Sequence, residues 1–76
     1  MSHEQNLGFA HAIAFQRSAL GISQQELAKR TKLHPSYMSD LEDGLTNPSV
    51  ESILKIADAL HVSVAELYPQ TGQSKD

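Results

Sequence analysis

The chain has 76 residues, no cysteine, and six Lys and Arg against nine Asp and Glu, so its formal net charge is −3. This length allows one small domain, and the missing cysteines exclude both a disulfide framework and a thiolate zinc site. Hydrophobic residues make up 39% of the chain, which is too many for a disordered protein. We therefore expect one domain over residues 1–76, with an ordered core over about 6–69 and a flexible polar tail over 70–76.

Neither end of the chain suggests export or membrane insertion. No apolar run approaches the roughly 18 residues that cross a bilayer. The N-terminal segment MSHEQNL lacks the basic and apolar regions of a signal peptide. The sequence therefore predicts a cytoplasmic protein with no membrane association.

Helical spacing begins near the N-terminus, and no strand or hairpin pattern interrupts it. One stripe at helical spacing predicts a first helix that ends at Gly21, and it consists of Phe9, Ile13, Arg17 and Leu20. Ser23 and Glu26 have the spacing of a capping box, which predicts a second helix that runs to about Lys32.

A third helix follows after a tight turn. His34 and Pro35 are typical of an N-cap and the first helical position, where a missing N–H costs nothing. The predicted helix buries Met38 and Leu41 and ends at Gly44. Two short helices joined by such a turn suggest a helix-turn-helix.

Two further helices complete the prediction. Ser49 is placed to cap a fourth helix whose apolar residues follow helical spacing, namely Val50, Ile53, Leu54, Ala57 and Leu60. Ser63 and Glu66 form a second capping box, which predicts a short fifth helix ending before Pro69. The expected fold class is all-α, with five short helices in one compact bundle.

The segment GISQQELAKRTKLHPSYMSDLEDG, followed by NPSVESILKIADALHVSVAELY, resembles the phage-repressor and Cro-like family, also called the xenobiotic-response-element type. The resemblance covers about Leu7 to Tyr68 and extends to small stand-alone repressors and restriction-modification controller proteins. It implies a lambda-repressor-like domain with the third helix in the major groove. The implied function is a sequence-specific transcriptional regulator that binds double-stranded DNA at an operator as a homodimer.

The resemblance also implies which residues act. Contacts to phosphates and bases would come from the start of the second helix, the third helix and the loop after it: Gln24, His34, Ser36, Tyr37, Ser39, Asp40, Thr46 and Asn47. It further implies an ion pair between Arg17 and Glu42. Because Arg17 lies on an apolar stripe, an unpaired charge there would be costly.

The distribution of charge opposes strong DNA binding. Residues 1–33 carry four cations and two carboxylates, whereas residues 34–76 carry two cations and seven carboxylates. Cations near phosphates supply most non-specific affinity for DNA. A second function therefore stays open, a protein-interaction module on the same scaffold whose acidic third helix binds a basic partner and binds DNA weakly or not at all. Asp40 could still accept a hydrogen bond from a cytosine amine.

A single helix-turn-helix contacts only a few base pairs, so we expect a symmetric homodimer. The last two helices offer the expected interface, formed by Val62, Val64, Leu67 and Tyr68. The competing interpretation is that these residues only close the bundle against the first helix. The four histidines lack metal-ligand spacing, and no catalytic motif is present, so we expect no metal, no cofactor and no enzymatic activity. The sequence leaves any small-molecule effector open.

Overall fold

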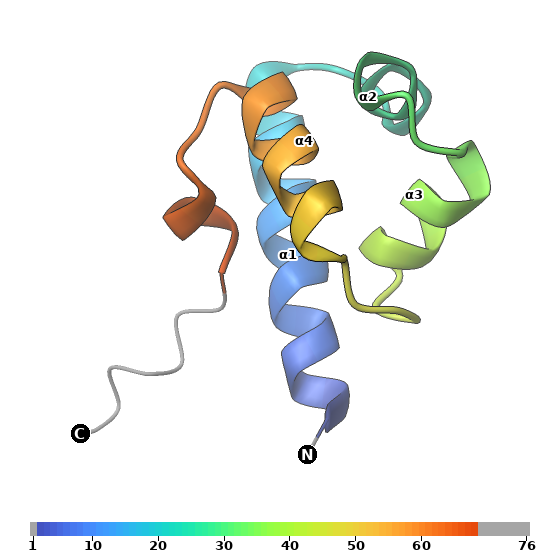
Figure 1. The fold of residues 1–76 in the computed structure, drawn as a ribbon, viewed down its shortest axis with the longest axis vertical. Coiled ribbons are helices and arrows are strands. Elements are labelled where there is room, and N and C mark those ends of the chain that lie inside the picture. Colours follow the sequence, from blue (N-terminus) through green and yellow to red (C-terminus); the bar gives the residue numbers. More distant parts are fainter. Residues whose placement is uncertain (1, 69–76) are drawn as a thin grey trace.

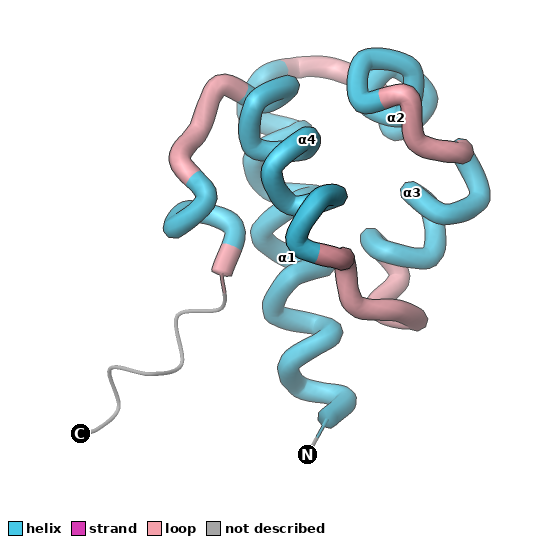
Figure 2. Tube along the Cα trace, in the orientation of Figure 1, coloured by secondary structure: helices cyan, strands magenta, loops and turns pink. Residues whose placement is uncertain are grey.

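The computed structural model describes residues 2–68, with side chains from Gly8 onward. Its elements are α1 (Ser2–Leu20), α2 (Gln24–Thr31), α3 (Pro35–Glu42), α4 (Val50–Leu60) and the 3-10 helix η1 (Val64–Leu67). The described part contains no strand, in agreement with the expected all-α class (Figure 2). In Figure 1, α4 packs along α1, with α2 and α3 on one side and η1 on the other. The tail expected over 70–76 lies outside the described residues.

Side-chain caps determine where the later α-helices begin. Ser23 Oγ accepts a hydrogen bond from the Glu26 N–H at 3.0 Å, and Ser49 Oγ accepts one from the Ser52 N–H at 3.1 Å. His34 takes the same position before α3. Each cap satisfies a backbone donor that has no partner inside its helix. The starts of α2, α3 and α4 therefore agree with the sequence prediction.

The expected fifth α-helix is a single 3-10 turn. Its capping box forms, because the Ser63 N–H donates to Glu66 Oε2 at 3.0 Å. Tyr68, directly after this turn, is already extended, with φ −77° and ψ 145°, the backbone conformation favoured before a proline such as Pro69. So short a segment cannot build a ladder of i to i−4 hydrogen bonds and closes with 3-10 geometry instead.

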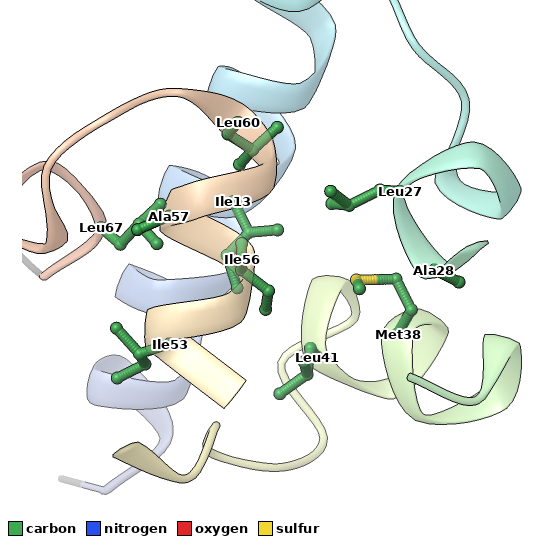
Figure 3. Close-up of a cluster of buried hydrophobic side chains, with 10 residues drawn as sticks. All are labelled: Ile13, Leu27, Ala28, Met38, Leu41, Ile53, Ile56, Ala57, Leu60 and Leu67. Atoms are coloured by element: carbon green, nitrogen blue, oxygen red, sulfur yellow. The ribbon is translucent and has the colours of Figure 1, made fainter. Parts of the chain in front are cut away.

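The hydrophobic core draws residues from all five elements and lies between α1, α4 and the α2–α3 pair (Figure 3). It consists of Ile13, Leu27, Ala28, Met38, Leu41, Ile53, Ile56, Ala57, Leu60 and Leu67. In Figure 3 the Met38 side chain leaves α3 on the side nearest α2, which contributes Leu27 and Ala28 to the same core. Burial of these side chains fixes the relative orientation of the two helices of the helix-turn-helix.

The buried stripe of α4 differs from the predicted one. Val50 and Leu54 belong to the predicted apolar stripe but are 70% and 55% exposed, whereas Ile56, which is not part of that stripe, is fully buried. Both stripes satisfy helical spacing, so the spacing alone does not distinguish them. Packing against α1 and α2 selects the stripe that contains Ile56. Leu20, in the last turn of α1, is also more exposed than its stripe predicted.

Candidate nucleic-acid interface

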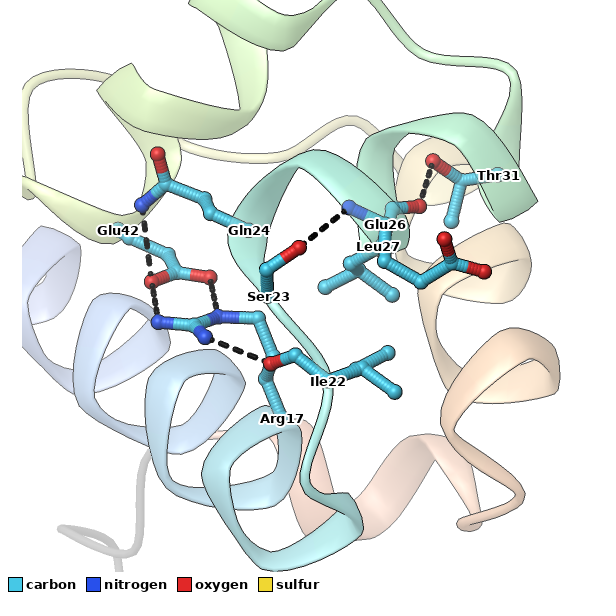
Figure 4. A network of polar contacts seen from close by, with 8 residues as sticks. All are labelled: Arg17, Ile22, Ser23, Gln24, Glu26, Leu27, Thr31 and Glu42. Carbon is cyan, nitrogen blue, oxygen red and sulfur yellow. Dashed lines mark hydrogen bonds and ion pairs between the residues drawn. The ribbon is translucent and has the colours of Figure 1, made fainter.

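A bidentate ion pair joins α1 to the end of α3. Arg17 Nε donates to Glu42 Oε2 at 2.7 Å, and Arg17 Nη2 donates to Glu42 Oε1 at 2.9 Å (Figure 4). The third nitrogen, Nη1, donates to the backbone carbonyl of Ile22 at 2.9 Å. The hydrogen bond to Glu42 raises the pKa of Arg17 above its ordinary value. The ion pair expected from the resemblance is thus present, and it anchors α3.

Glu42 also holds the first residue of α2. Gln24 Nε2 donates to Glu42 Oε1 at 3.1 Å (Figure 4). The Glu42 side chain is only 5% exposed, so its carboxylate faces these donors rather than water. Because the Gln24 amide nitrogen carries two hydrogens, one remains for another acceptor. The contact therefore positions Gln24 at the start of α2 without using all its donors.

Two neighbouring polar side chains meet at the start of α3. His34 Nδ1 accepts a hydrogen bond from the Ser36 backbone N–H at 3.1 Å. Ser36 Oγ lies 2.8 Å from the same ring nitrogen. Both residues are exposed, so this pair is accessible to a ligand.

The exposed side of α3 is polar and acidic. Ser36, Asp40 and Asp43 are exposed and Ser39 is half-buried, while the opposite side of the helix is in the core. We call these four residues the α3 outer face. Positions three, four and seven apart lie on one side of a helix, so their side chains share a surface. The structure thus brings Ser36, Ser39 and Asp40 together on one side of α3.

Tyr37 is directed elsewhere. Its hydroxyl lies 3.1 Å from the hydroxyl of the buried Ser52 on α4. The Ser49 backbone N–H donates to the same Tyr37 oxygen at 3.4 Å. The half-buried ring therefore ties α3 to the start of α4, away from the α3 outer face.

The loop between α3 and α4 lacks basic residues. Thr46 is half-buried, Asn47 is exposed, and Leu45 beside them is 70% exposed.

The cations of α2 lie in its last turn, where Arg30 Nε donates to Glu26 at 2.8 Å. This hydrogen bond lowers the pKa of Glu26. The positive charge of α2 therefore lies in its last turn rather than on α3.

The residues expected at a dimer interface fall into two groups. Leu67 is 0% exposed and belongs to the core, so its side chain is not accessible to a partner. Val62 and Val64 are half-buried against the core, and the Tyr68 ring lies 5.3 Å from the ring of Phe9. Tyr68 is nevertheless partly exposed.

Sequence reasoning missed Leu54 as a surface residue. It lies one turn before Ala57, which points toward Leu67 of η1 (Figure 3). From this spacing we infer that the exposed Leu54 borders the side of α4 that faces η1. We call Leu54, Val62, Val64 and Tyr68 the α4–η1 edge. The sequence did indicate that some apolar side chain of α4 must be exposed, because α4 contains more apolar residues than a single buried stripe holds.

The described residues contain neither a membrane-spanning helix nor a metal-binding group. Over residues 2–68, no helix has both the length and the apolar character needed to cross a membrane. Among the side chains of residues 8–68, no group of three or more His, Asp or Glu is arranged to hold a metal ion.

A helix-turn-helix family model matches residues 13–67. The chain is 38% identical over 60 residues to the HTH-type transcriptional regulator Rv0474 of Mycobacterium tuberculosis, covering 79% of this chain and 43% of that protein. It is 42% identical over 50 residues to the control protein C.BamHI of Bacillus amyloliquefaciens, covering 66% of this chain and 62% of that one. The chain therefore spans less than half of the mycobacterial relative.

Solved structures agree with this assignment. The crystal structure of the restriction-modification controller protein C.AhdI from Aeromonas hydrophila is similar with a TM-score of 0.82 and 35% identity, covering 86% of this chain and 98% of that one. The clp gene regulator ClgR from Corynebacterium glutamicum gives a TM-score of 0.78 at 30% identity, covering 83% of this chain and 82% of that one. The chain thus belongs to the helix-turn-helix family, and the proteins it resembles include transcriptional regulators and restriction-modification control proteins.

Proposed function

We propose that this protein is a sequence-specific transcriptional regulator that occupies an operator as a homodimer, with α3 of each copy in the major groove. The observation that carries the proposal is the α3 outer face, where Ser36 and Asp40 are exposed on a helix whose other side is anchored in the core. A rigid helix with an exposed polar row is the arrangement that contacts base edges. The protein then acts in the compartment that holds the DNA, the cytoplasm, and needs neither a cofactor nor catalysis.

Contacts to the phosphates come from either side of α3. Gln24 offers its second amide hydrogen at the start of α2, beside backbone N–H groups that have no partner in the helix. Thr46 and Asn47 lie in the loop after α3 and supply a hydroxyl and an amide. These contacts are uncharged, so they position the protein while releasing few counterions.

Because each domain carries little positive charge near α3, binding to an operator needs a second copy of the protein. No Lys or Arg stands between His34 and Lys55, so one domain gains little electrostatic attraction to DNA. The α4–η1 edge supplies apolar surface for a symmetric contact, now including Leu54 and excluding the buried Leu67. Two copies related by a two-fold axis place their α3 helices in half-sites about 34 Å apart.

A mobility-shift experiment at low salt tests the proposal. The full chain is titrated into a pool of random-sequence duplexes, and non-specific binding is expected at protein concentrations of about 10–100 µM. A sequence enriched from that pool by repeated selection should bind at least about 10³-fold more tightly than the pool. A protein that shifts no duplex over this range contradicts the proposal.

The acidic residues favour a second candidate function. Asp40, Glu42, Asp43 and Glu51 follow one another without an intervening cation, and three of the four are exposed. Such a surface attracts a basic protein segment rather than phosphate. Under this candidate the protein fails to shift duplex DNA but binds a lysine-rich peptide with an affinity that falls as salt is added.

A further inference from the structure

The contact at the start of α3 determines which nitrogen of His34 carries hydrogen. A backbone N–H is always a donor, and the Ser36 N–H points at His34 Nδ1 at 3.1 Å. Nδ1 must therefore offer its lone pair, which places the hydrogen of the neutral ring on Nε2. The opposite tautomer would direct two N–H groups at each other.

The same constraint fixes the hydroxyl of Ser36. Its oxygen lies 2.8 Å from His34 Nδ1, which has no hydrogen to donate. The contact is favourable only if the Ser36 hydroxyl donates to the ring nitrogen and shares its single lone pair with the Ser36 backbone N–H. Once that hydrogen is used, the Ser36 oxygen presents only lone pairs to a ligand. A serine that could have donated or accepted thus becomes an acceptor.

Asp40 extends this acceptor surface by one turn. It is exposed and four residues after Ser36, so the two side chains lie on the same side of α3. An ionised carboxylate also accepts and cannot donate. The two acceptors are about 5–6 Å apart along the helix, while successive bases on one strand are about 3.4 Å apart. They therefore reach bases one or two steps apart.

We propose that α3 recognises exocyclic amino groups, with Ser36 and Asp40 each accepting from an adenine N6 or a cytosine N4 amine. This inference rests on the proposed function and specifies the DNA chemistry that it recognises. In the major groove, adenine and cytosine present an amine where guanine and thymine present a carbonyl. Each half-site therefore contains two positions, one or two steps apart on one strand, that admit A or C and reject G or T. His34 is the residue that positions the Ser36 hydroxyl.

The first test is selection of operators from a random duplex library with the full chain. We expect two such A-or-C positions, with G or T disfavoured about tenfold at each, the effect of one lost hydrogen bond to a fixed partner. Ser36→Ala should relax the choice at one position only, whereas Ser18→Ala, an exposed serine on α1, should relax neither. Selected G or T at the position that Ser36→Ala relaxes overturns the inference and leaves DNA binding intact. Enrichment of no sequence at all overturns both.

Two variants of His34 test its positioning role. In His34→Asn the side-chain oxygen can still cap α3 and accept from Ser36, so the preference for A or C should persist. In His34→Ala the Ser36 hydroxyl is free to turn and donate, so G and T should become acceptable at the Ser36 position alone. Equal preferences in His34→Ala and the wild type contradict the inference, as does loss of the preference in His34→Asn.

The tautomer is measurable without DNA. Nitrogen-15 chemical shifts of the His34 ring near neutral pH should show the hydrogen on Nε2 and an unprotonated Nδ1. A neutral ring with its hydrogen on Nδ1 overturns the inference whatever the DNA-binding result. A protein that binds no DNA but has the Nε2–H tautomer refutes the proposed function instead.

Discussion

The α3 outer face and the α4–η1 edge differ in the side chains that they expose and in the contacts that hold those side chains in place. On α3 the exposed side chains are polar, and hydrogen bonds fix the groups around them, from the His34–Ser36 pair to the bidentate contact of Glu42. On the α4–η1 edge the exposed side chains are apolar, as Leu54 and Tyr68 show. Fixed polar groups can discriminate between ligands, whereas apolar groups gain free energy mainly by being covered.

The largest expected effect comes from removing the anchor of the α3 outer face. Glu42→Ala leaves Arg17 without its carboxylate partner in a site where the Glu42 side chain is 5% exposed. Loss of one partner of a partly buried pair should lower the free energy of unfolding by about 1–4 kcal/mol. Urea denaturation measures this loss, and an unchanged stability would contradict the anchoring role.

A matched control uses the exposed pair on α2. Arg30 and Glu26 also form an ion pair, but both side chains are about two-fifths exposed, at 40% and 41%. Arg30→Ala should therefore cost much less stability than Glu42→Ala, because exposed pairs contribute little.

Next in size is the expected effect on self-association. Leu54→Lys and Tyr68→Glu each introduce a charge into the α4–η1 edge and should weaken the homodimer by roughly tenfold or more. Sedimentation equilibrium measures the dissociation constant. Phe15→Ser, a change at an exposed residue of α1 that is not part of the edge, should leave it unchanged. A wild-type protein that stays at 8.3 kDa at hundreds of micromolar would show that the homodimer does not form without DNA.

A smaller effect is expected from changing the charge of the α3 outer face. Asp40→Arg removes a repulsive carboxylate and adds a cation near phosphate, so non-specific affinity for random duplexes should rise severalfold. The slope of log affinity against log salt should steepen by about one. Asp58→Arg makes the same charge change at an exposed residue of α4 and should have less effect. Equal effects of the two changes would place α3 away from the DNA.

The smallest expected effect is the pH dependence of the exposed pair on α2. The hydrogen bond from Arg30 lowers the pKa of Glu26, so the folded state favours the ionised carboxylate. Its contribution to stability is present above the pKa of the unfolded chain and is lost as pH falls through the lowered pKa. Glu26→Gln should therefore be slightly less stable than the wild type at neutral pH and equal to it in acid. A difference that grows in acid would contradict this sign.

The helix starts and the helix-turn-helix could be predicted because each depends on residues with specific local roles. Ser23, His34 and Ser49 act as caps within three residues of chain, so their effect is visible in the sequence. The resemblance supplied the pairing across α1 and α3, which spacing alone could not give.

The errors of the sequence prediction arise where tertiary packing decides. Val50 and Leu54 fit a helical stripe as well as Ile56 does, and only the neighbours of α4 distinguish them. Tyr37 was expected to face DNA, and its hydroxyl lies beside Ser52 of α4, a contact that its position in the sequence does not reveal. The acceptor-only state of Ser36 depends on a contact between side chains, which no propensity encodes.

The contrast between the two surfaces can be tested by one nuclear magnetic resonance titration of the full chain with an operator duplex obtained by selection. We expect the largest amide shifts at Gln24, at residues 34–40 and at residues 45–47, and we expect the shifts at residues 54 and 62–68 to stay small once the protein is already dimeric. Shifts concentrated on the α4–η1 edge, with none on α3, would contradict the central claim that α3 is the DNA-binding helix.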